Sequence, residues 1–375
     1  MKILHITPEA PGPYSGGRLA VLQTTLSITG REHVVDYIGP EMDPEIQFRY
    51  HKCFYPQKEQ NKLKLLCNLA RGVTNKSYNE WKQLDIDYSS YDAVILEFSK
   101  QSYILEKVDP EKLILHSHNV EYDYSRRLFN LEKTAKNLVI QQLSNYQEKT
   151  LLTRSRQIVT LTEADKKRYL ELYPVSAQDI SVIPVCVARE IGPIINNNPK
   201  TMIITGSLWY GPNYDGIKWF LDEVFPKINK DISLIIAGGS PNDELKSRVQ
   251  NNQGRIMLID SPKDMDAYFR KASLSVAPVF DGAGMKVKVA EALSYGLPVV
   301  GTSHAFTGYD ISPGLNSFVA DTADGFAEAI NGYFEGTVMD IMVTRSHASD
   351  LYRSKYSMES SVKAWNKVLN SMQKE

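Results

Sequence analysis

Short apolar runs alternate with longer segments of helical periodicity through the first half of the chain. Each run has the length and the β-branched content of a buried strand. Strands are expected at residues 3–7, 34–38, 93–96, 113–115, 158–161 and 180–183, and helices at 18–29, 130–153 and 162–173. Because strands alternate with helices, the pattern predicts an α/β unit whose parallel sheet is covered by helices.

The same alternation returns after residue 200. Strands are expected at 202–205, 234–237, 256–259, 274–280 and 299–300, and helices at 214–225, 242–250, 263–271, 324–335 and 348–372. The segment 187–200 between the two halves lacks periodicity and contains three asparagines and two prolines, so we expect a linker there. A chain of 375 residues is long enough for two domains, which we place at 1–190 and 200–354.

Composition and charge argue against several classes of protein. The formal net charge is −1, whereas nucleic-acid-binding proteins are usually basic. The three cysteines are widely spaced and lack CxxC spacing, so neither a disulfide framework nor a zinc–thiolate site is expected. No window approaches the ~18 apolar residues of a membrane span, and the first apolar run is too short for a signal peptide. We expect a soluble or at most peripheral protein in a reducing compartment.

The most informative stretch lies at residues 281–302. A loop containing Gly282 and Gly284 leads into an apolar helix, whose N-terminus favours anions because its N–H groups are free. Lys286 and Lys288 add positive charge there. Glu291 is a carboxylate among apolar residues, which is costly unless something binds it. Phosphate at the mouth and hydroxyls further in would suit a nucleotide-sugar, whereas a simple ion pair between Lys288 and Glu291 is the alternative.

This stretch resembles the nucleotide-binding segment of the retaining glycosyltransferases of family 4, which have the GT-B fold. In that family two glutamates lie eight positions apart, and the second, which holds the nucleotide ribose, matches Glu291. The first would fall at Ala283 and is missing. One branch of the family has a Gly-rich turn followed by basic residues two apart, and the four residues from Met285 to Lys288 follow that branch.

The resemblance implies two Rossmann-like domains that face each other across a cleft. The first domain, joined by a C-terminal helix at 355–375, would bind the acceptor, and the second would bind the donor. The implied reaction moves a sugar from a nucleotide diphospho-sugar to the hydroxyl of a glycan or lipid-linked acceptor, with retention and without a metal or other cofactor. Assembly of a surface polysaccharide in the cytoplasm is the implied setting. A nucleotide-sugar 2-epimerase of the same fold and a non-catalytic nucleotide-sugar-binding protein stay open as alternatives.

The resemblance also implies which residues surround the donor diphosphate. These are Gly17, Gly206, Ser207, Asp281, Gly282, Gly284, Met285, Val287 and Glu291, with Lys286 and Lys288 as the catalytic cations. Many relatives carry an arginine and a lysine in the turn after the strand at 202–205, but here the first cation is Lys218, within a helix. On a regular helix, side chains two residues apart point about 200° from each other. Both catalytic lysines therefore reach one diphosphate only if Lys286 precedes the helix or lies in its first, irregular turn.

Two further loops carry candidate residues in the first half. Gly16, Gly17 and Arg18 follow the first strand and do not form a dinucleotide-binding G-x-G-x-x-G fingerprint. In the family a Gly-Gly pair in this loop reaches the donor diphosphate or the acceptor, and we assign Gly16 and Arg18 to the acceptor. An ordinary strand–helix turn is the alternative.

His116 and His118 follow the strand at 113–115. They therefore lie at its carboxyl end, where open α/β sheets bind ligands. By resemblance we expect His118 to face the donor sugar and to be catalytic, and His116 to belong to the strand. A structural histidine is the alternative for His118. A metal site is not expected, because no third ligand is evident near this pair and the family needs no metal.

Residues 58–82 combine six basic side chains with four leucines. A basic segment with an apolar stripe can rest on a membrane surface and approach a lipid-linked acceptor. A surface helix whose apolar stripe faces the core is the alternative.

Overall fold

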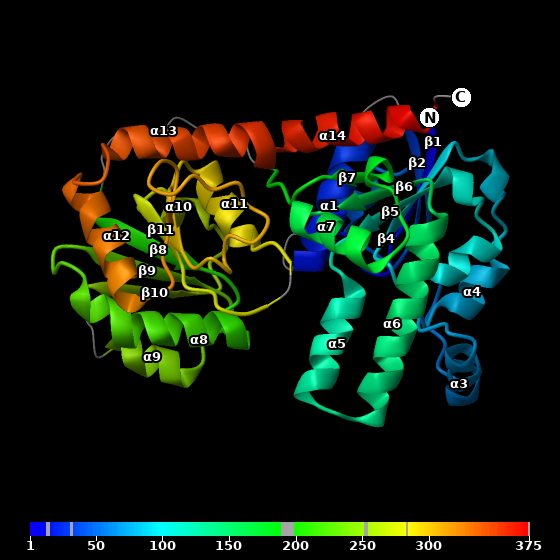
Figure 1. Cartoon of the computed structure of the whole chain (residues 1–375), viewed down its shortest axis with the longest axis horizontal. Coiled ribbons are helices and arrows are strands. Elements are labelled where there is room, and N and C mark those ends of the chain that lie inside the picture. The colour runs from blue at the N-terminus through cyan, green and yellow to red at the C-terminus, as the bar shows by residue number, and fades with distance from the viewer. Residues whose placement is uncertain (13–15, 31–32, 189–198, 251–253, 283, 374–375) are drawn as a thin grey trace. The chain divides into compact units, whose positions relative to one another are not determined.

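The structure is a computed structural model that describes residues 1–12, 16–30, 33–188, 199–250, 254–282 and 284–373. The chain forms two compact units (Figure 1). The N-terminal unit consists of Met1–Pro184 and Ser361–Glu375, and the C-terminal unit of Val185–Ser360. Most of the predicted linker, residues 189–198, and Ala283 of the glycine loop lie outside the described residues.

The N-terminal unit is built on a seven-stranded sheet in the order β3-β2-β1-β4-β5-β6-β7, with all neighbours parallel. Its strands are β1 (Lys2–Ile6), β2 (Val34–Ile38), β3 (Lys52–Phe54), β4 (Ala93–Glu97), β5 (Leu113–Ser117), β6 (Gln157–Thr160) and β7 (Ile180–Val182). The predicted strands are confirmed, and β3 is an addition. The chain runs outward from β1 to β3 and then crosses to β4 on the other side, so the switch point lies between β1 and β4.

Seven α-helices are described in the N-terminal portion of this unit. They are α1 (Gly16–Thr29), α2 (Pro44–Gln47), α3 (Lys62–Ala70), α4 (Tyr78–Gln83), α5 (Glu121–Leu131), α6 (Ala135–Arg154) and α7 (Glu163–Leu172). The predicted helix at 130–153 is wrong at its start, because α5 ends at Leu131 and a second helix begins after Thr134. The Thr134 hydroxyl accepts a hydrogen bond from the Asn137 N–H at 3.2 Å, which fixes this N-terminus.

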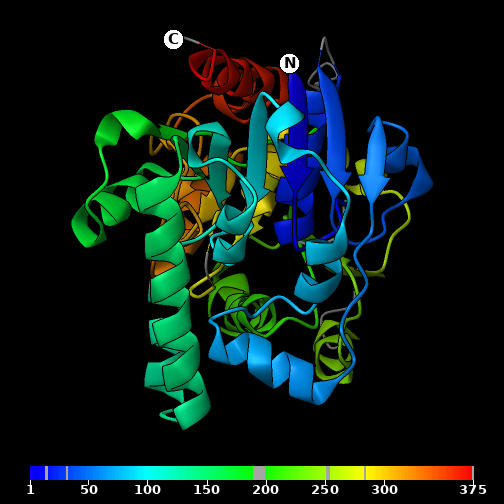
Figure 2. The same cartoon turned by 90° about the vertical axis from the view of Figure 1, so that its right-hand side faces the viewer.

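The C-terminal helix α14 (Met358–Ser371) belongs to the N-terminal unit from Ser361 onward, which confirms the expected return to the first domain. Trp365, Val368 and Leu369 are buried with Ile3 and Val35 in one hydrophobic cluster. Figures 1 and 2 both place α14 beside the N-terminus of the chain. The predicted start at 355 is wrong, since a π-helical turn at Tyr352–Tyr356 precedes α14.

The C-terminal unit is built on a six-stranded sheet in the order β10-β9-β8-β11-β12-β13, again with all neighbours parallel. Its strands are β8 (Thr201–Thr205), β9 (Ser233–Gly238), β10 (Ile256–Asp260), β11 (Leu274–Ala277), β12 (Val299–Gly301) and β13 (Phe318–Val319). The predicted strand at 274–280 ends early at Ala277. Pro278 follows, and a proline lacks the N–H that a ladder needs. The switch point of this sheet lies between β8 and β11.

Within the described residues, six α-helices accompany this sheet. They are α8 (Gly211–Trp219), α9 (Asp243–Gln250), α10 (Asp266–Phe269), α11 (Val287–Ser294), α12 (Ala323–Glu335) and α13 (Ile341–Leu351). Helix α10 is shorter than the predicted helix at 263–271, and α8 continues into a π-helical turn at Phe220–Val224. The predicted tail helix at 348–372 is in fact α13 and α14, separated by the π-helical turn. Among the described residues, the helices are all too short or too polar to cross a membrane.

Candidate active-site residues in the two units

The glycine loop of the C-terminal unit follows β11, at the switch point of its sheet, where open α/β sheets bind ligands. Gly282 and Gly284 have φ values of 104° and 70°, which side chains rarely adopt, so the loop requires glycine at both positions. Helix α11 begins at Val287, and Lys286 is its N-cap residue in an extended conformation. Lys286 thus precedes the helix, which meets the condition set by the spacing of the two lysines.

The ammonium group of Lys286 turns back onto its own loop. It donates hydrogen bonds to the carbonyl oxygens of Gly282 at 2.9 Å and Gly284 at 2.7 Å. His304 Nε2 lies 2.8 Å from the same Gly282 oxygen. These contacts hold the loop in one shape and keep a positive charge beside the backbone N–H groups at the start of α11.

Lys288 connects the glycine loop to the turn after β8. Its ammonium donates to Asn213 Oδ1 at 2.8 Å. A Cβ atom on Gly206, whose φ is 139°, would lie only 3.0 Å from the Lys288 nitrogen. The backbone conformation of Gly206 therefore favours glycine, and a side chain there would also press on the Lys288 ammonium. The structure brings Gly206, Asn213 and Lys288 together from distant parts of the sequence.

Burial lowers the pKa of Lys288 to about 8, although the neighbouring Glu291 carboxylate acts to raise it, and the positive charge of Lys286 lowers it further. The cost of the charge comes mainly from lost hydration. An anion bound beside the ammonium would offset that cost. The residues around Lys288 within the C-terminal unit therefore compensate only part of the cost of burying its positive charge.

Tyr309 is a residue of this region that our sequence analysis missed. Its hydroxyl donates to the Lys286 carbonyl oxygen at 2.9 Å and accepts from the Ala290 N–H at 3.2 Å. The Lys286 side chain makes no capping hydrogen bond at the start of α11, so the Tyr309 hydroxyl provides the cap from a distant loop. The Tyr356 ring packs against it, with the ring centroids 4.9 Å apart. No sequence signal marks a tyrosine that caps a helix nineteen residues earlier.

The other predicted donor residues lie around this loop. Asp281 Oδ1 accepts a hydrogen bond from the Gly282 N–H at 2.7 Å, and the Ser207 carbonyl oxygen accepts one from Asn213 Nδ2 at 3.0 Å. Met285 is buried, while Val287 and Glu291 are half-buried on α11. The predicted residues 206–207 and 281–291 are thus neighbours within one unit, as their placement after adjacent strands requires.

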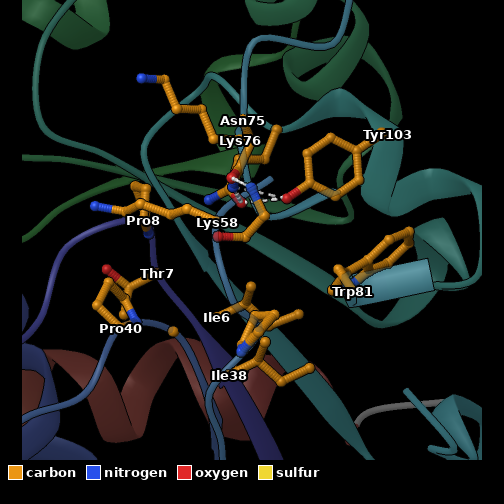
Figure 3. A pocket seen from close by; sticks show the side chains of 14 residues that line it. Ile6, Thr7, Pro8, Ile38, Pro40, Lys58, Asn75, Lys76, Trp81 and Tyr103 are labelled. Atoms are coloured by element: carbon orange, nitrogen blue, oxygen red, sulfur yellow. Dashed lines mark hydrogen bonds between the residues drawn. The ribbon is translucent and has the colours of Figure 1, made fainter. Parts of the chain in front are cut away.

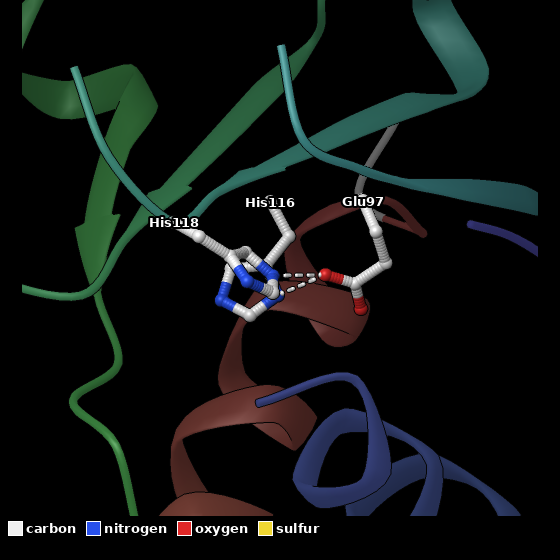
Figure 4. Close-up of side chains that lie close together, drawn as sticks. All are labelled: Glu97, His116 and His118. Carbon is white, nitrogen blue, oxygen red and sulfur yellow. Dashed lines mark hydrogen bonds and ion pairs between the residues drawn. The ribbon is translucent and has the colours of Figure 1, made fainter. Parts of the chain in front are cut away.

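In the N-terminal unit, the Glu97 carboxylate lies at the centre of three histidines. Its Oε2 atom is 2.8 Å from His116 Nδ1 and 2.5 Å from His118 Nε2 (Figure 4). Its Oε1 atom is 2.9 Å from His5 Nε2. Strands β1, β4 and β5 are neighbours, and His5, Glu97 and His116 meet across them. Glu97 was not predicted from the sequence, although an acidic residue that ends the apolar run of β4 is a usable signal.

The protonation of this cluster follows from its contacts. Burial alone would raise the pKa of Glu97, but the charges and hydrogen bonds of His116 and His118 hold it well below the usual value. Burial lowers the pKa of His118, although Glu97 acts to raise it. A neutral His118 that donates its Nε2–H to Glu97 has a lone pair on Nδ1. That Nδ1 atom is buried and has no hydrogen-bond partner among the described residues, so it can accept a hydrogen bond.

Gly17 lies next to the residue that covers His118. The Phe98 ring packs on the His118 ring with centroids 4.0 Å apart, and Phe98 has a φ of 66°, which is unfavourable for a bulky side chain. A Cβ atom on Gly17 would lie 3.3 Å from Phe98 Cζ and 2.9 Å from Glu9 Oε2, so a larger residue would press on the Phe98 ring and displace the Glu9 carboxylate. Of the predicted acceptor residues, Gly16 begins α1, and the exposed Arg18 donates to the Ala10 carbonyl oxygen at 3.1 Å.

The expectation that the histidine pair lacks a third ligand nearby is wrong. Glu97, His116 and His118 each offer a ligand atom, and these atoms lie within 4.8 Å of one another. Two imidazoles and a carboxylate are a donor set that zinc accepts. In this structure the same atoms bond to each other, so the three side chains form a hydrogen-bonded cluster.

Two parallel-sheet units of seven and six strands, with a C-terminal helix returning to the first unit, define the GT-B fold. The HepE protein of Anabaena, solved with UDP, superposes with a TM-score of 0.66 at 15% identity over 99% of this chain and 100% of that one. WaaG, a glycosyltransferase involved in lipopolysaccharide biosynthesis, superposes with a TM-score of 0.70 at 12% identity over 99% of this chain and 100% of that one.

Residues 199–335 match the family model of the glycosyl transferases group 1. This match covers the glycine loop, both lysines and α11. A 44.6 kDa protein encoded in the cps region of Klebsiella pneumoniae is 26% identical over 366 residues, which span 88% of this chain and 90% of that protein. The chain is thus similar to the glycosyl transferases group 1 over residues 199–335 and shares the GT-B fold over nearly its whole length.

Proposed function

We propose that this protein transfers a sugar from a nucleotide diphospho-sugar to an acceptor hydroxyl, with retention at the anomeric carbon. The observation that carries the proposal is the pair of lysines at the start of α11, placed at the switch point of a sheet whose sequence matches the glycosyl transferases group 1. HepE, which shares the fold, was solved with UDP and with UDP-glucose. The relative from a cps region favours a role in surface polysaccharide assembly.

The main chemical task in this reaction is to stabilise the departing nucleotide diphosphate. Lys288 and the backbone N–H groups at the start of α11 face that charge from fixed positions, and Lys286 joins them when its loop carbonyls are exchanged for phosphate oxygens. Preorganised donors of this kind typically contribute about 2.7–4 kcal/mol each to transition-state stabilisation. Gly206, Ser207 and Gly17 let the backbone approach the phosphates closely.

Two side chains of the protein accept hydrogen bonds from hydroxyls of the donor, one from the ribose and one from the transferred sugar. The Glu291 carboxylate, one turn beyond Lys288 on α11, accepts from the ribose hydroxyls. His118 Nδ1 accepts from a hydroxyl of the transferred sugar, and Glu97 holds the tautomer that makes this possible.

The remaining site residues surround the two substrates. Asp281 and Met285 border the sugar and the phosphates, and Gly16 and Arg18 contact the acceptor. No metal takes part in the proposed reaction, because the lysines and helix amides supply the positive charge.

The direct test of this function incubates the protein with a panel of nucleotide-sugars and glycan acceptors and identifies the products by mass spectrometry and NMR. We expect transfer or slow donor hydrolysis in the wild type, unaffected by EDTA, and a loss of about 100-fold in Lys288→Ala, because one preorganised contact is removed. Epimerised donor without transfer would identify the 2-epimerase, and nucleotide-sugar binding without any turnover would identify a binding protein.

We further propose that the protein works at the inner face of the membrane and contacts it through residues 58–82. Leu63, Leu66 and Leu69 lie at intervals of three on α3 and are 73%, 61% and 40% exposed, so the stripe does not face the core. Lys62 and Lys64 are exposed on the same helix. Co-sedimentation with vesicles rich in anionic phosphatidylglycerol tests this contact. Wild-type binding that persists in Leu63→Ser/Leu66→Ser would contradict it.

A further inference from the structure

A pocket of about 140 Å³ lies inside the N-terminal unit, at the carboxyl ends of β1 and β2 (Figure 3). Ile6, Thr7 and Pro8 border it from β1 and the residues that follow it, and Ile38 and Pro40 from β2 and the turn after it. The opposite side comes from residues near α3, α4 and β4: Pro56, Lys58, Asn75, Lys76, Ser77, Trp81, Gln101 and Tyr103. Its size is below the ~300–1,000 Å³ of sites for drug-sized ligands, so it suits one small group.

The polar wall of this pocket has a fixed orientation. The Ser77 N–H donates to Asn75 Oδ1 at 2.8 Å, which directs Asn75 Nδ2 toward Gln101. Asn75 Nδ2 and the Tyr103 hydroxyl then donate to Gln101 Oε1 at 2.7 Å and 2.6 Å. Because its oxygen accepts both bonds, the Gln101 amide must point its Nε2 group the other way.

The donors of Gln101 have no acceptor among the described residues. Gln101 is 3% exposed, and its Nε2 atom is buried without a hydrogen-bond partner. A buried donor that stays unpaired is unfavourable, because it has lost its hydrogen bonds to water. The Gln101 amide therefore favours a ligand that brings acceptor oxygens.

The charged groups of the pocket are all cationic. Lys58 and Lys76 line it, and its lining contains no aspartate or glutamate. Neither lysine pairs with a carboxylate within the described residues, whereas the nearby Glu59 accepts from Asn79 at 2.9 Å and pairs with Lys64 at 3.4 Å. In Figure 3 the two lysine side chains extend to the same side, away from Trp81 and Tyr103. A ligand with negative charge is thus favoured over a neutral one.

We propose that this pocket binds an oxyanion, a carboxylate or a phosphate, carried by the acceptor substrate. The proposal rests on the proposed function, in which the N-terminal unit presents the acceptor. Lys58 and Lys76 neutralise the oxyanion, and the Gln101 amide donates to one of its oxygens. The Trp81 and Tyr103 rings pack against the sugar or carrier that bears it. The acceptor class is therefore an anionic glycan or glycolipid.

Two sources carry this chemistry: the carboxylate of an acidic sugar and the phosphate of a lipid-linked carrier. We would titrate sodium glucuronate and geranyl phosphate separately into the full-length protein saturated with UDP, so that the donor site is occupied. We expect one of the two probes to bind, and its affinity to fall about tenfold or more in Lys58→Gln/Lys76→Gln and in Gln101→Met, because each change removes a charge or the buried donor. The probe that binds identifies the source.

Lys133→Gln/Lys136→Gln is the matched control, since these lysines are exposed in the same unit and the change removes two positive charges that do not line the pocket. The proposal is overturned if neither probe binds the wild type, or if the control loses affinity as strongly as the pocket variant. Both lysines of the pocket are exposed, so their replacement leaves the core intact. Saturation by UDP is checked first, and a protein that binds no UDP but binds a probe would contradict the proposed donor site and leave the pocket standing.

Discussion

Lys288 shows how one residue's surroundings prepare it for a ligand. Its ammonium donates a hydrogen bond to Asn213 Oδ1 at 2.8 Å and lies close to Gly206. Burial lowers its pKa to about 8. Because the lowered pKa lies close to neutrality, the charge that the proposed diphosphate site needs is present below about pH 8 and lost above it.

The affinity for UDP should therefore decline as the pH rises through about 8. The sign follows from linkage: the complex favours protonated Lys288, so binding weakens where the free protein has lost that proton. Isothermal titration between pH 7 and 9.5 measures the effect. Lys288→Arg, whose guanidinium stays charged, should remove the decline, whereas Lys218→Arg on α8 should retain it. A flat profile in the wild type would contradict the assignment.

Glu97 in the N-terminal unit is a positioning residue: it fixes the tautomer of His118 and does not contact the substrate itself. Replacement by glutamine keeps the shape but allows the amide to donate to an imidazole, which disturbs the tautomer of His118. A hydrogen bond to a charged group contributes about 1.5–3 kcal/mol, so we expect kcat for transfer to fall about tenfold or more in Glu97→Gln, with UDP affinity unchanged. Nitrogen-15 NMR of the histidine rings should show the altered tautomer, and unaltered ring signals would refute the positioning role.

At the scale of elements, helix α11 depends on a cap from outside itself. The Tyr309 hydroxyl bonds both the Lys286 carbonyl and the Ala290 N–H, and Tyr356 supports its ring. The Tyr309 hydroxyl thereby holds the end of the loop that carries Gly282 and Gly284, at the point where it joins α11. The order of the proposed diphosphate site is thus a property of three elements in the C-terminal unit: the loop, α11 and the π-helical turn that contains Tyr356.

Tyr309→Phe removes two hydrogen bonds and should lower the free energy of unfolding by about 1–2 kcal/mol. It should also speed amide exchange at residues 284–290 and weaken UDP binding, because the loop loses its brace. Tyr333→Phe is the control, since that hydroxyl donates to the Ser273 carbonyl oxygen at 2.8 Å, elsewhere in the same unit. If both variants weaken UDP binding equally, the Tyr309 hydroxyl does not act by holding the glycine loop in place.

At the scale of the whole molecule, the sequence pattern was sufficient for the architecture. Strands such as β1 and β4 are buried on both faces and read as continuous apolar runs, which is how parallel sheets appear in a sequence. The edge strands β3 and β13 have three and two residues, too few to form a pattern. The break between α5 and α6 was missed because leucines continue on both sides of the turn.

The candidate site was predictable where its residues form a motif in the sequence or match the family that the chain resembles. Gly282, Gly284, Lys286 and Lys288 form one motif, and the structure places them in one loop and helix start. Glu97 and Tyr309 act through partners that neighbouring strands and loops bring to them, so their role depends on the tertiary structure. The same holds for the pocket at Gln101, whose Nε2 group has no partner among the described residues because Asn75 and Tyr103 both bond to the amide oxygen.

A crystal structure of the protein with UDP tests the central claim most directly. We predict that the pyrophosphate binds at the start of α11, within hydrogen-bonding distance of the Lys288 ammonium and the loop amides. The ribose should contact Glu291, and Lys286 should turn from its loop carbonyls toward the phosphate. UDP bound elsewhere on the chain, or bound there with Lys288 still on Asn213 and no lysine on the phosphates, would contradict it.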